Sequence, residues 1–266
     1  MTHDGRPIGV FDSGLGGLTV MRSLIDLLPD EDLVYFGDTG RFPYGPKPAE
    51  EVCKYAFEIT DCLLEQGVKM LVVACNSAAA AALDQLQSYV DIPVIGVIEP
   101  GIRAARQVTR TKRVGVIGTV GTISSGAYQR AAAAYAPEIT LACAACPGFV
   151  EFVEAGDVES DQVHVLAERL LRPVADAGVD TLVLGCTHYP LLARTIGDVM
   201  GPDVVLVSSA DETAFEVRRI LQADIRVPIS RGRHEFITSG DVETFRHLGA
   251  RFLGPEVDSV EAWTWS

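Results

Sequence analysis

Two cysteines occupy equivalent places in an internal repeat, and they are the side chains best suited to chemistry. The segment 65–77, which contains Cys75, aligns without gaps on the segment 176–188, which contains Cys186, at an offset of 111 residues. Five of the thirteen aligned positions are identical. Each cysteine follows an apolar run and precedes polar residues that can cap a following helix. Apolar packing does not explain these polar residues, so we infer that both cysteines belong to a site.

Two thiols on opposite sides of a cleft suit proton exchange at one carbon atom. One sulfur removes the hydrogen from one face while the other delivers a hydrogen to the opposite face, so the configuration inverts. A thiol acts as a base only as its thiolate, and we expect a helix N-terminus to lower the thiol pKa towards neutrality. Since two thiolates repel each other, the pair should share one proton and titrate together. The pattern predicts a two-base racemase or epimerase; inherited packing of two small residues is the alternative.

Three loops supply candidate binding groups. The glycines of the loop 12–17 let the backbone approach a ligand and point amides at an anion. Its spacing does not fit a dinucleotide fingerprint, and the loop 118–122 lacks the lysine of a phosphate loop. We expect both to be small-anion cradles with Ser13, Thr119 and Thr122 as donors, and plain tight turns are the alternative. The third loop, 43–46, is a rigid turn before a helix.

Three ionisable side chains are expected near the cleft: Asp12, Glu154 and His188. His188 lies two residues after Cys186, so we expect it to tune that thiol, with helix capping as the alternative. A solvated helix end is the alternative for Glu154. These groups would support the two thiols.

We expect no cofactor and no metal. Cys143 and Cys146 have metal or redox spacing, but no second pair or nearby histidine completes a zinc site, so both are expected to be structural. Cys53 and Cys62 fall in a helical pattern and are expected in the core. None of the four lysines stands at a strand end suited to a Schiff base, which argues against pyridoxal phosphate.

The elements that position these residues alternate along the chain. Apolar runs predict strands at 8–11, 33–36, 70–74, 94–97, 114–117, 140–144, 181–184 and 204–207. Helical patterns predict helices at 18–28, 48–65, 78–89, 102–108, 124–136 and 162–177. This alternation is typical of an α/β protein with mainly parallel sheets covered on both faces. Such sheets bind ligands at the carboxyl ends of their strands, where both cysteines stand.

The repeat predicts two pseudo-symmetric α/β domains with the active site in the cleft between them. The first domain is predicted to comprise 1–97 plus 211–266 and to carry Cys75; the second comprises 98–210 and carries Cys186. The tail holds a helical pattern at 212–221, a strand at 234–238 and a short helix at 242–248. This is too little for a third domain, so we expect it to pack on the first half.

Composition and charge exclude several classes of protein. The 266 residues are 48% hydrophobic, which indicates a globular chain. A net charge of −14 argues against nonspecific binding to nucleic acid or anionic lipid, although it allows a basic protein partner. The longest uncharged stretch, 114–129, is too short to span a membrane. No apolar leader segment precedes the first strand, so we expect a cytoplasmic location with six reduced thiols.

Five motifs give the chain a resemblance to a known family. They are FDSGLGG at 11–17, GDT at 37–39, PYG at 43–45, ACNSA at 74–78 and GCTHYP at 185–190. In this order they resemble the cofactor-independent glutamate racemases of the aspartate/glutamate racemase superfamily. The resemblance implies interconversion of L- and D-glutamate, which supplies D-glutamate for bacterial peptidoglycan, and a homodimer.

The resemblance also implies roles for individual residues. Cys75 and Cys186 would be the two acid/base residues, with Asp12, Glu154 and His188 in support. The substrate-binding residues would be Asp12, Ser13, Pro43, Tyr44, Gly45, Asn76, Ser77, Thr119, Thr122, Thr187 and His188. The family usually has Thr where Ser77 stands, and the hydroxyl is kept. Two alternatives stay open: an amidase or decarboxylase with Cys186 as nucleophile, and a racemase of aspartate or a hydantoin.

Overall fold

Two parallel sheets form the framework of the molecule, which is a computed structural model describing residues 4–221, 231–257 and 259–265. The first sheet has the order β10-β9-β2-β1-β3-β4, and the second has the order β6-β5-β7-β8. The strands are β1 Ile8–Asp12, β2 Leu33–Gly37, β3 Met70–Val73, β4 Val94–Gly96, β5 Arg113–Gly118, β6 Thr140–Ala145, β7 Thr181–Gly185, β8 Val205–Ser208, β9 His234–Thr238 and β10 Val260–Ala262. All neighbouring strands pair in parallel.

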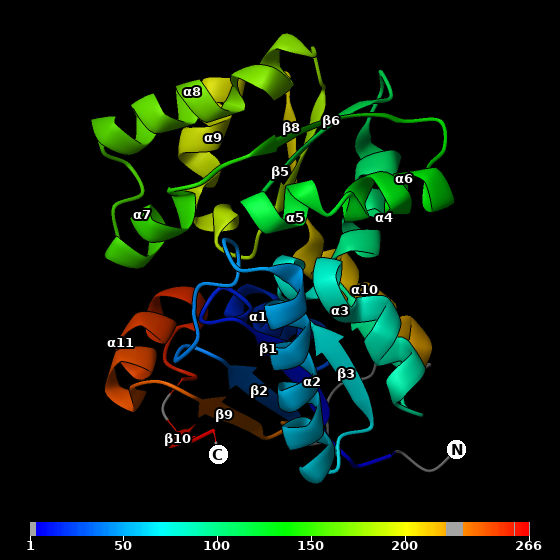
Figure 1. Cartoon of the computed structure of the whole chain (residues 1–266), viewed down its shortest axis with the longest axis vertical. Helices are drawn as coiled ribbons and strands as arrows, with labels where there is room; N and C mark the ends of the chain where they lie inside the picture. Colours follow the sequence, from blue (N-terminus) through cyan, green and yellow to red (C-terminus); the bar gives the residue numbers. More distant parts are fainter. Residues whose placement is uncertain (1–3, 222–230, 258, 266) are drawn as a thin grey trace.

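Helices follow most strands and cover both faces of each sheet (Figure 1). They are α1 Leu18–Leu27, α2 Ala49–Glu65, α3 Asn76–Tyr89, α4 Ile98–Val108, α5 Val120–Ser124, α6 Ala127–Tyr135, α7 Phe149–Ala155, α8 Asp161–Asp176, the 3₁₀ helix η1 Tyr189–Leu192, α9 Ala193–Met200, α10 Ser209–Leu221 and α11 Val242–Leu253. In Figure 1 the unit built on the second sheet lies above the unit built on the first, and the tail elements β9 and α11 belong to the lower unit.

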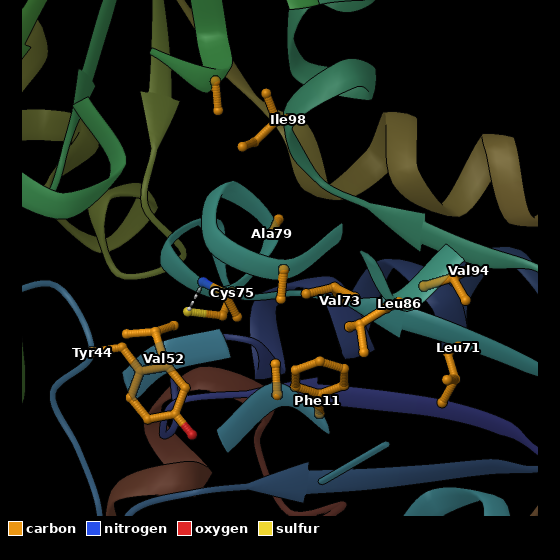
Figure 2. Close-up of a cluster of buried hydrophobic side chains, with 14 of the residues drawn as sticks. Phe11, Tyr44, Val52, Leu71, Val73, Cys75, Ala79, Leu86, Val94 and Ile98 are labelled. Carbon is orange, nitrogen blue, oxygen red and sulfur yellow. Dashed lines mark hydrogen bonds between the residues drawn. The ribbon is translucent and has the colours of Figure 1, made fainter. Parts of the chain in front are cut away.

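The central strands are apolar throughout because helices cover them on both sides. Every residue of β1 is buried, and its side chains alternate between two hydrophobic clusters. Phe11 packs in the cluster beneath α2 and α3, shown in Figure 2, whereas Val10 packs in the cluster beneath α1 and α11. The first of these clusters also contains Val116 and Tyr128 of the second unit, so the two units share apolar contacts. This shared packing sets the spacing of the loops between them.

The predicted fold class is confirmed: the chain is α/β with parallel sheets. Each of the eight strands predicted before residue 210 lies within one residue of its predicted ends. The predicted helix 124–136 is wrong as a single element, because Gly126 adopts a left-handed φ of 71° and separates α5 from α6. The last helix runs to Leu253 instead of ending at 248, and α7, α9 and β10 were not predicted.

The tail returns to the first sheet. Strand β9 pairs with β2, and β10 adds to β9 at the edge of the sheet. The domain boundaries at 97/98 and 210/211 themselves stay a prediction. None of the helices in the described ranges combines the length and apolar character that a membrane span requires.

Candidate active site

Cys75 lies at the junction of β3 and α3, at the carboxyl end of the first sheet. The Ala78 N–H donates to its Sγ at 3.5 Å, so Cys75 itself caps α3 (Figure 2). The sequence predicts the polar residues after the cysteine as possible caps, whereas in the structure the cysteine has this role. The thiol donates in turn to Ser13 Oγ, 3.7 Å away on the loop after β1. Only 5% of Cys75 is exposed.

Cys186 occupies the equivalent place after β7 in the second sheet. Thr187 and His188 follow it, and then the short η1, so the first α-helix after this thiol begins only at Ala193. His188 stands at the start of η1 without a capping hydrogen bond from its side chain, so the capping alternative is wrong. Its Nε2 instead donates to Glu154 Oε1 at 2.7 Å. Glu154 is therefore a partner of His188 and not merely a solvated helix end.

Both thiols line the same cavity. Nine other predicted site residues also line it: Ser13, Pro43, Tyr44, Gly45, Asn76, Ser77, Thr119, Thr187 and His188. Three do not: Asp12, Thr122 and Glu154. Asp12 is fully buried and accepts hydrogen bonds from Gly14 N at 2.8 Å and Thr187 Oγ1 at 3.2 Å. These three residues support the groups that form the wall.

A cluster of hydroxyls joins the two units on one side of the cavity. Ser77 Oγ lies 3.0 Å from Thr119 Oγ1 and 3.3 Å from Thr122 Oγ1, and the two threonine hydroxyls are 3.0 Å apart. Beside them the Gly121 N–H donates to Gly45 O at 2.9 Å. A Cβ at Gly45 would lie 2.8 Å from the Thr119 Cβ, so glycine permits this close approach. The predicted binding loops of the two units are thus in direct contact.

The glycine-rich loop after β1 makes a similar approach on the other side. A Cβ at Gly16 would collide with the side chains of Thr187 and His188. The glycine therefore lets the first unit pack closely against the residues that follow Cys186. Use of this loop as an anion cradle stays a prediction.

The ionisable groups around the thiols have strongly perturbed equilibria. Burial alone lowers the pKa of His188, but interactions with Cys186 and Glu154 outweigh burial and raise it from 6.5 to about 10. His188 is therefore protonated at neutral pH and places positive charge beside Cys186. Burial raises the pKa of Asp12, against the opposing effects of His188 and of the hydrogen bonds from Gly14 and Thr187.

The expectation that a helix N-terminus lowers the thiol pKa is wrong for Cys75. Burial raises the pKa of this thiol to about 12, and the carboxylate of Asp12 acts in the same direction. The hydrogen bonds that Cys75 makes with Ala78 and Ser13 oppose this rise but do not outweigh it. The surroundings of Cys75 therefore favour its neutral thiol at neutral pH.

Sequence reasoning missed several residues of the site. Tyr128, in α6, donates to Asn76 Oδ1 at 2.7 Å and leaves the Asn76 amide N–H groups free to donate elsewhere. Cys146, which was expected to be structural, lines the cavity, and burial raises its pKa to about 12. Phe42 and Glu151 also contribute to the wall. Tyr128 lies in an ordinary helical pattern, so no local signal could have identified it.

No group of three or more His, Cys, Asp or Glu side chains within the described ranges is arranged to hold a metal ion.

The chain is similar to proteins of one family over almost its whole length. A family model described as Asp/Glu/Hydantoin racemase matches residues 8–216. A glutamate racemase from Mycobacterium leprae is 53% identical, over 96% of this chain and 94% of the relative. The glutamate racemase isoform RacE1 from Bacillus anthracis superimposes with a TM-score of 0.93 at 44% identity, covering 98% of each chain. The glutamate racemase from Francisella tularensis, solved in complex with D-glutamate, has a TM-score of 0.90 at 35% identity and covers 98% of each chain.

Proposed function

Because the chain belongs to the Asp/Glu/hydantoin racemase family, we propose that it interconverts L- and D-glutamate with Cys75 and Cys186 as the acid/base pair. The observation that carries the proposal is that two thiols from separate sheets line one cavity. The sequence-based assignment to the racemases is confirmed, and the enzyme is an amino-acid racemase. The two-thiol mechanism is the part that we infer from the site.

In the proposed reaction the two thiols exchange roles in each turnover. One cysteine, as its thiolate, takes the α-proton of glutamate and becomes a thiol. The other cysteine, as its thiol, gives a proton to the opposite face of the same carbon and becomes a thiolate. One proton leaves and one arrives, so no oxidant or other reactant is needed. The reverse reaction restores the starting protonation states.

Charges on the substrate help to explain how Cys75 can ionise. The α-ammonium of glutamate brings positive charge into a cavity in which burial and Asp12 favour the neutral thiol. Asp12 lies behind the Thr187 hydroxyl, where its carboxylate can attract that ammonium. On the other side, the protonated His188 stabilises negative charge on the Cys186 sulfur. The hydroxyls of Ser77 and Thr119 and the Asn76 amide are available to bind the substrate carboxylates.

Exchange of the α-hydrogen with solvent tests the reaction directly. Incubation of L-glutamate with the reduced enzyme in deuterated water, without added cofactor, should bring the circular dichroism of the amino acid to zero and place deuterium at Cα. D-glutamate should give the same final mixture. Retention of the starting configuration by enzyme with intact thiols would refute the proposal. Aspartate and hydantoins, tested alongside, would show whether glutamate is the preferred substrate.

An amidase or decarboxylase with Cys186 as nucleophile is the competing chemistry. Such an enzyme has no evident need for Cys75, although both thiols line the cavity. A Cys75→Ala variant should therefore lose racemisation under the two-thiol mechanism. Release of ammonia or carbon dioxide by this variant would favour the nucleophilic alternative.

We place this reaction in the supply of D-glutamate for bacterial peptidoglycan, in the cytoplasm. Both statements rest on the family and on the sequence. Homodimerisation is a further prediction from the family, which sedimentation of the purified protein would test. A basic protein partner, which the charge of −14 allows, stays a minor alternative.

A further inference from the structure

A buried carboxylate beneath the active site accepts hydrogen bonds from distant parts of the chain. Asp38, just after β2, is 0% exposed. Its Oδ1 accepts from Ser239 Oγ at 2.5 Å and from Trp265 Nε1 at 3.1 Å. Its Oδ2 accepts from Arg41 Nε at 2.7 Å and from the Tyr44 hydroxyl. Asp38 therefore connects the tail of the chain to residues of the loop that follows β2.

Arg41 strengthens this connection through its position between two aromatic rings. Its guanidinium carbon lies 3.8 Å from the centre of the Trp265 ring and 4.0 Å from the centre of the Tyr55 ring. Another of its nitrogens donates to Glu58. Cation–π contacts stabilise a guanidinium group more strongly when water is excluded from it. Trp265 thus contacts Arg41 through the face of its indole ring and binds Asp38 through its indole N–H.

The residue at the far end of this network belongs to the active site. Tyr44 lies in the turn 43–45, which we call the substrate turn because all three of its residues line the cavity. Figure 2 shows Tyr44 and Cys75 at the same edge of the core. The Tyr44 hydroxyl is tied to Asp38, and Gly45 O accepts from Gly121 of the second unit at 2.9 Å. The substrate turn is thus fixed from below by the network and from above by the other unit.

We propose that Trp265 is a positioning residue, which holds the substrate turn in its binding geometry through Asp38 and Arg41. This inference rests on the proposed function of the cavity. Trp265 does not line the cavity, so it acts on substrate only through the turn. Loss of Trp265 should therefore weaken the binding of glutamate more than it slows proton transfer.

The neighbouring Trp263 provides a matched control. Both tryptophans pack against Phe36, with ring centres 6.1 Å away for Trp263 and 5.4 Å away for Trp265. The buried Trp263 Nε1, however, has no hydrogen-bond partner among the described residues, whereas Trp265 Nε1 binds Asp38. Replacement of either ring removes similar apolar contact, but only replacement of Trp265 disturbs Asp38.

Steady-state kinetics of three variants test the proposal. Trp265→Ala should raise KM for glutamate about tenfold, since it removes the hydrogen bond to Asp38 and the cation–π contact with Arg41, and kcat should change less than threefold. Trp265→Phe keeps a ring over Arg41 and should show an intermediate KM. Trp263→Phe should keep KM within twofold of wild type. Equal KM values for folded Trp265→Phe and Trp263→Phe would overturn the proposal, as would a fall in kcat at unchanged KM.

Hydrogen–deuterium exchange gives a readout that does not depend on activity. Amides of the segment 41–47 should exchange faster in Trp265→Phe than in Trp263→Phe, because local opening controls exchange in such a loop. Equal exchange in the two variants would overturn the proposal. Wild-type protein that fails to racemise glutamate would refute the proposed function instead, and the exchange rates would still decide whether Trp265 holds the turn.

Discussion

The two thiol sites stand at equivalent places in sheets of the same strand order, yet different groups surround them. The order β2-β1-β3-β4 around Cys75 matches the order β6-β5-β7-β8 around Cys186. Cys75 caps a fourteen-residue α-helix and contacts Ser13. Cys186 precedes a short 3₁₀ helix and has His188 two residues along the chain. The repeat therefore fixes where the sulfur atoms lie, whereas the loops determine their electrostatics.

This difference matters because a two-base mechanism demands both sulfurs in both protonation states. At the Cys186 site the positive charge is built into the protein, as a protonated imidazole held by Glu154. At the Cys75 site the protein supplies burial and a nearby carboxylate, both of which favour the thiol. We infer that the positive charge of the substrate ammonium favours ionisation of Cys75. The two related halves thus place their thiols in the same geometry but surround them with different charged groups.

Replacement of either thiol should have the largest effect. Cys75→Ser and Cys186→Ser should each lower racemisation by a factor on the order of 10²–10⁴, the usual contribution of a positioned acid or base, because a serine hydroxyl ionises far less readily. The remaining thiol should still exchange the α-hydrogen of one enantiomer with solvent. The two variants should favour opposite enantiomers, measured by deuterium incorporation into separated D- and L-glutamate.

Cys53→Ser provides the control for removal of a thiol. Cys53 is half-buried in α2 and does not line the cavity, so this variant should keep wild-type activity. Preference of both active-site variants for the same enantiomer would contradict the assignment of one thiol to each face.

Removal of the positive charge of His188 should have the next largest effect. His188→Asn should lower kcat/KM roughly 10- to 100-fold, since a hydrogen bond to a charged group contributes about 1.5–3 kcal/mol. The value of kcat/KM must fall by the same factor for L- and for D-glutamate, because the two enantiomers have the same free energy. The primary isotope effect with α-deuterated glutamate should nevertheless increase more in one direction, the one in which Cys186 removes the hydrogen. A symmetric increase would show that His188 serves both thiols alike.

The sequence predicted most of this arrangement because its main features are local. Strands such as β1 and β7 are continuous apolar runs, and a cysteine at the end of one is recognisable from its neighbours alone. The repeat then brought Cys75 and Cys186 to equivalent places. The partners of these residues come from distant parts of the chain, so no local sequence pattern predicts them. Tyr128 meets Asn76 across the two units, and Trp265 meets Asp38 from the tail.

Electrostatics was also beyond local prediction. A helix N-terminus at Cys75 was correctly anticipated, but its effect on the thiol pKa was not, since burial depends on everything packed around the sulfur. Likewise α7 was missed because only seven residues separate Gly148 from Gly156, too few for a clear helical period.

The contact between Tyr128 and Asn76 should have a smaller effect, on binding. Tyr128→Phe removes the donor to Asn76 Oδ1 while it keeps the buried ring, so the amide is free to turn its oxygen towards the cavity. KM for glutamate should rise about two- to tenfold, the worth of one neutral hydrogen bond, with little change in kcat. Tyr135→Phe, on the same helix but facing solvent, is the matched control. An unchanged KM for Tyr128→Phe would show that Asn76 keeps its orientation without this bond.

The smallest effect concerns how the Cys186 site contributes to folding stability at different pH. Because the pKa of His188 is raised from 6.5 to about 10 in the folded protein, protonation favours folding, and this contribution is fully present below pH 6.5. It should be lost as the pH rises through about 10. The Tm of wild type minus that of His188→Asn should therefore shrink by several degrees over this window. His164→Asn, at an exposed histidine of α8 that does not line the cavity, provides the control for replacement of a histidine. A difference that is constant with pH would mean that His188 is neutral in the folded enzyme, and the asymmetry between the two thiol sites would then need another source.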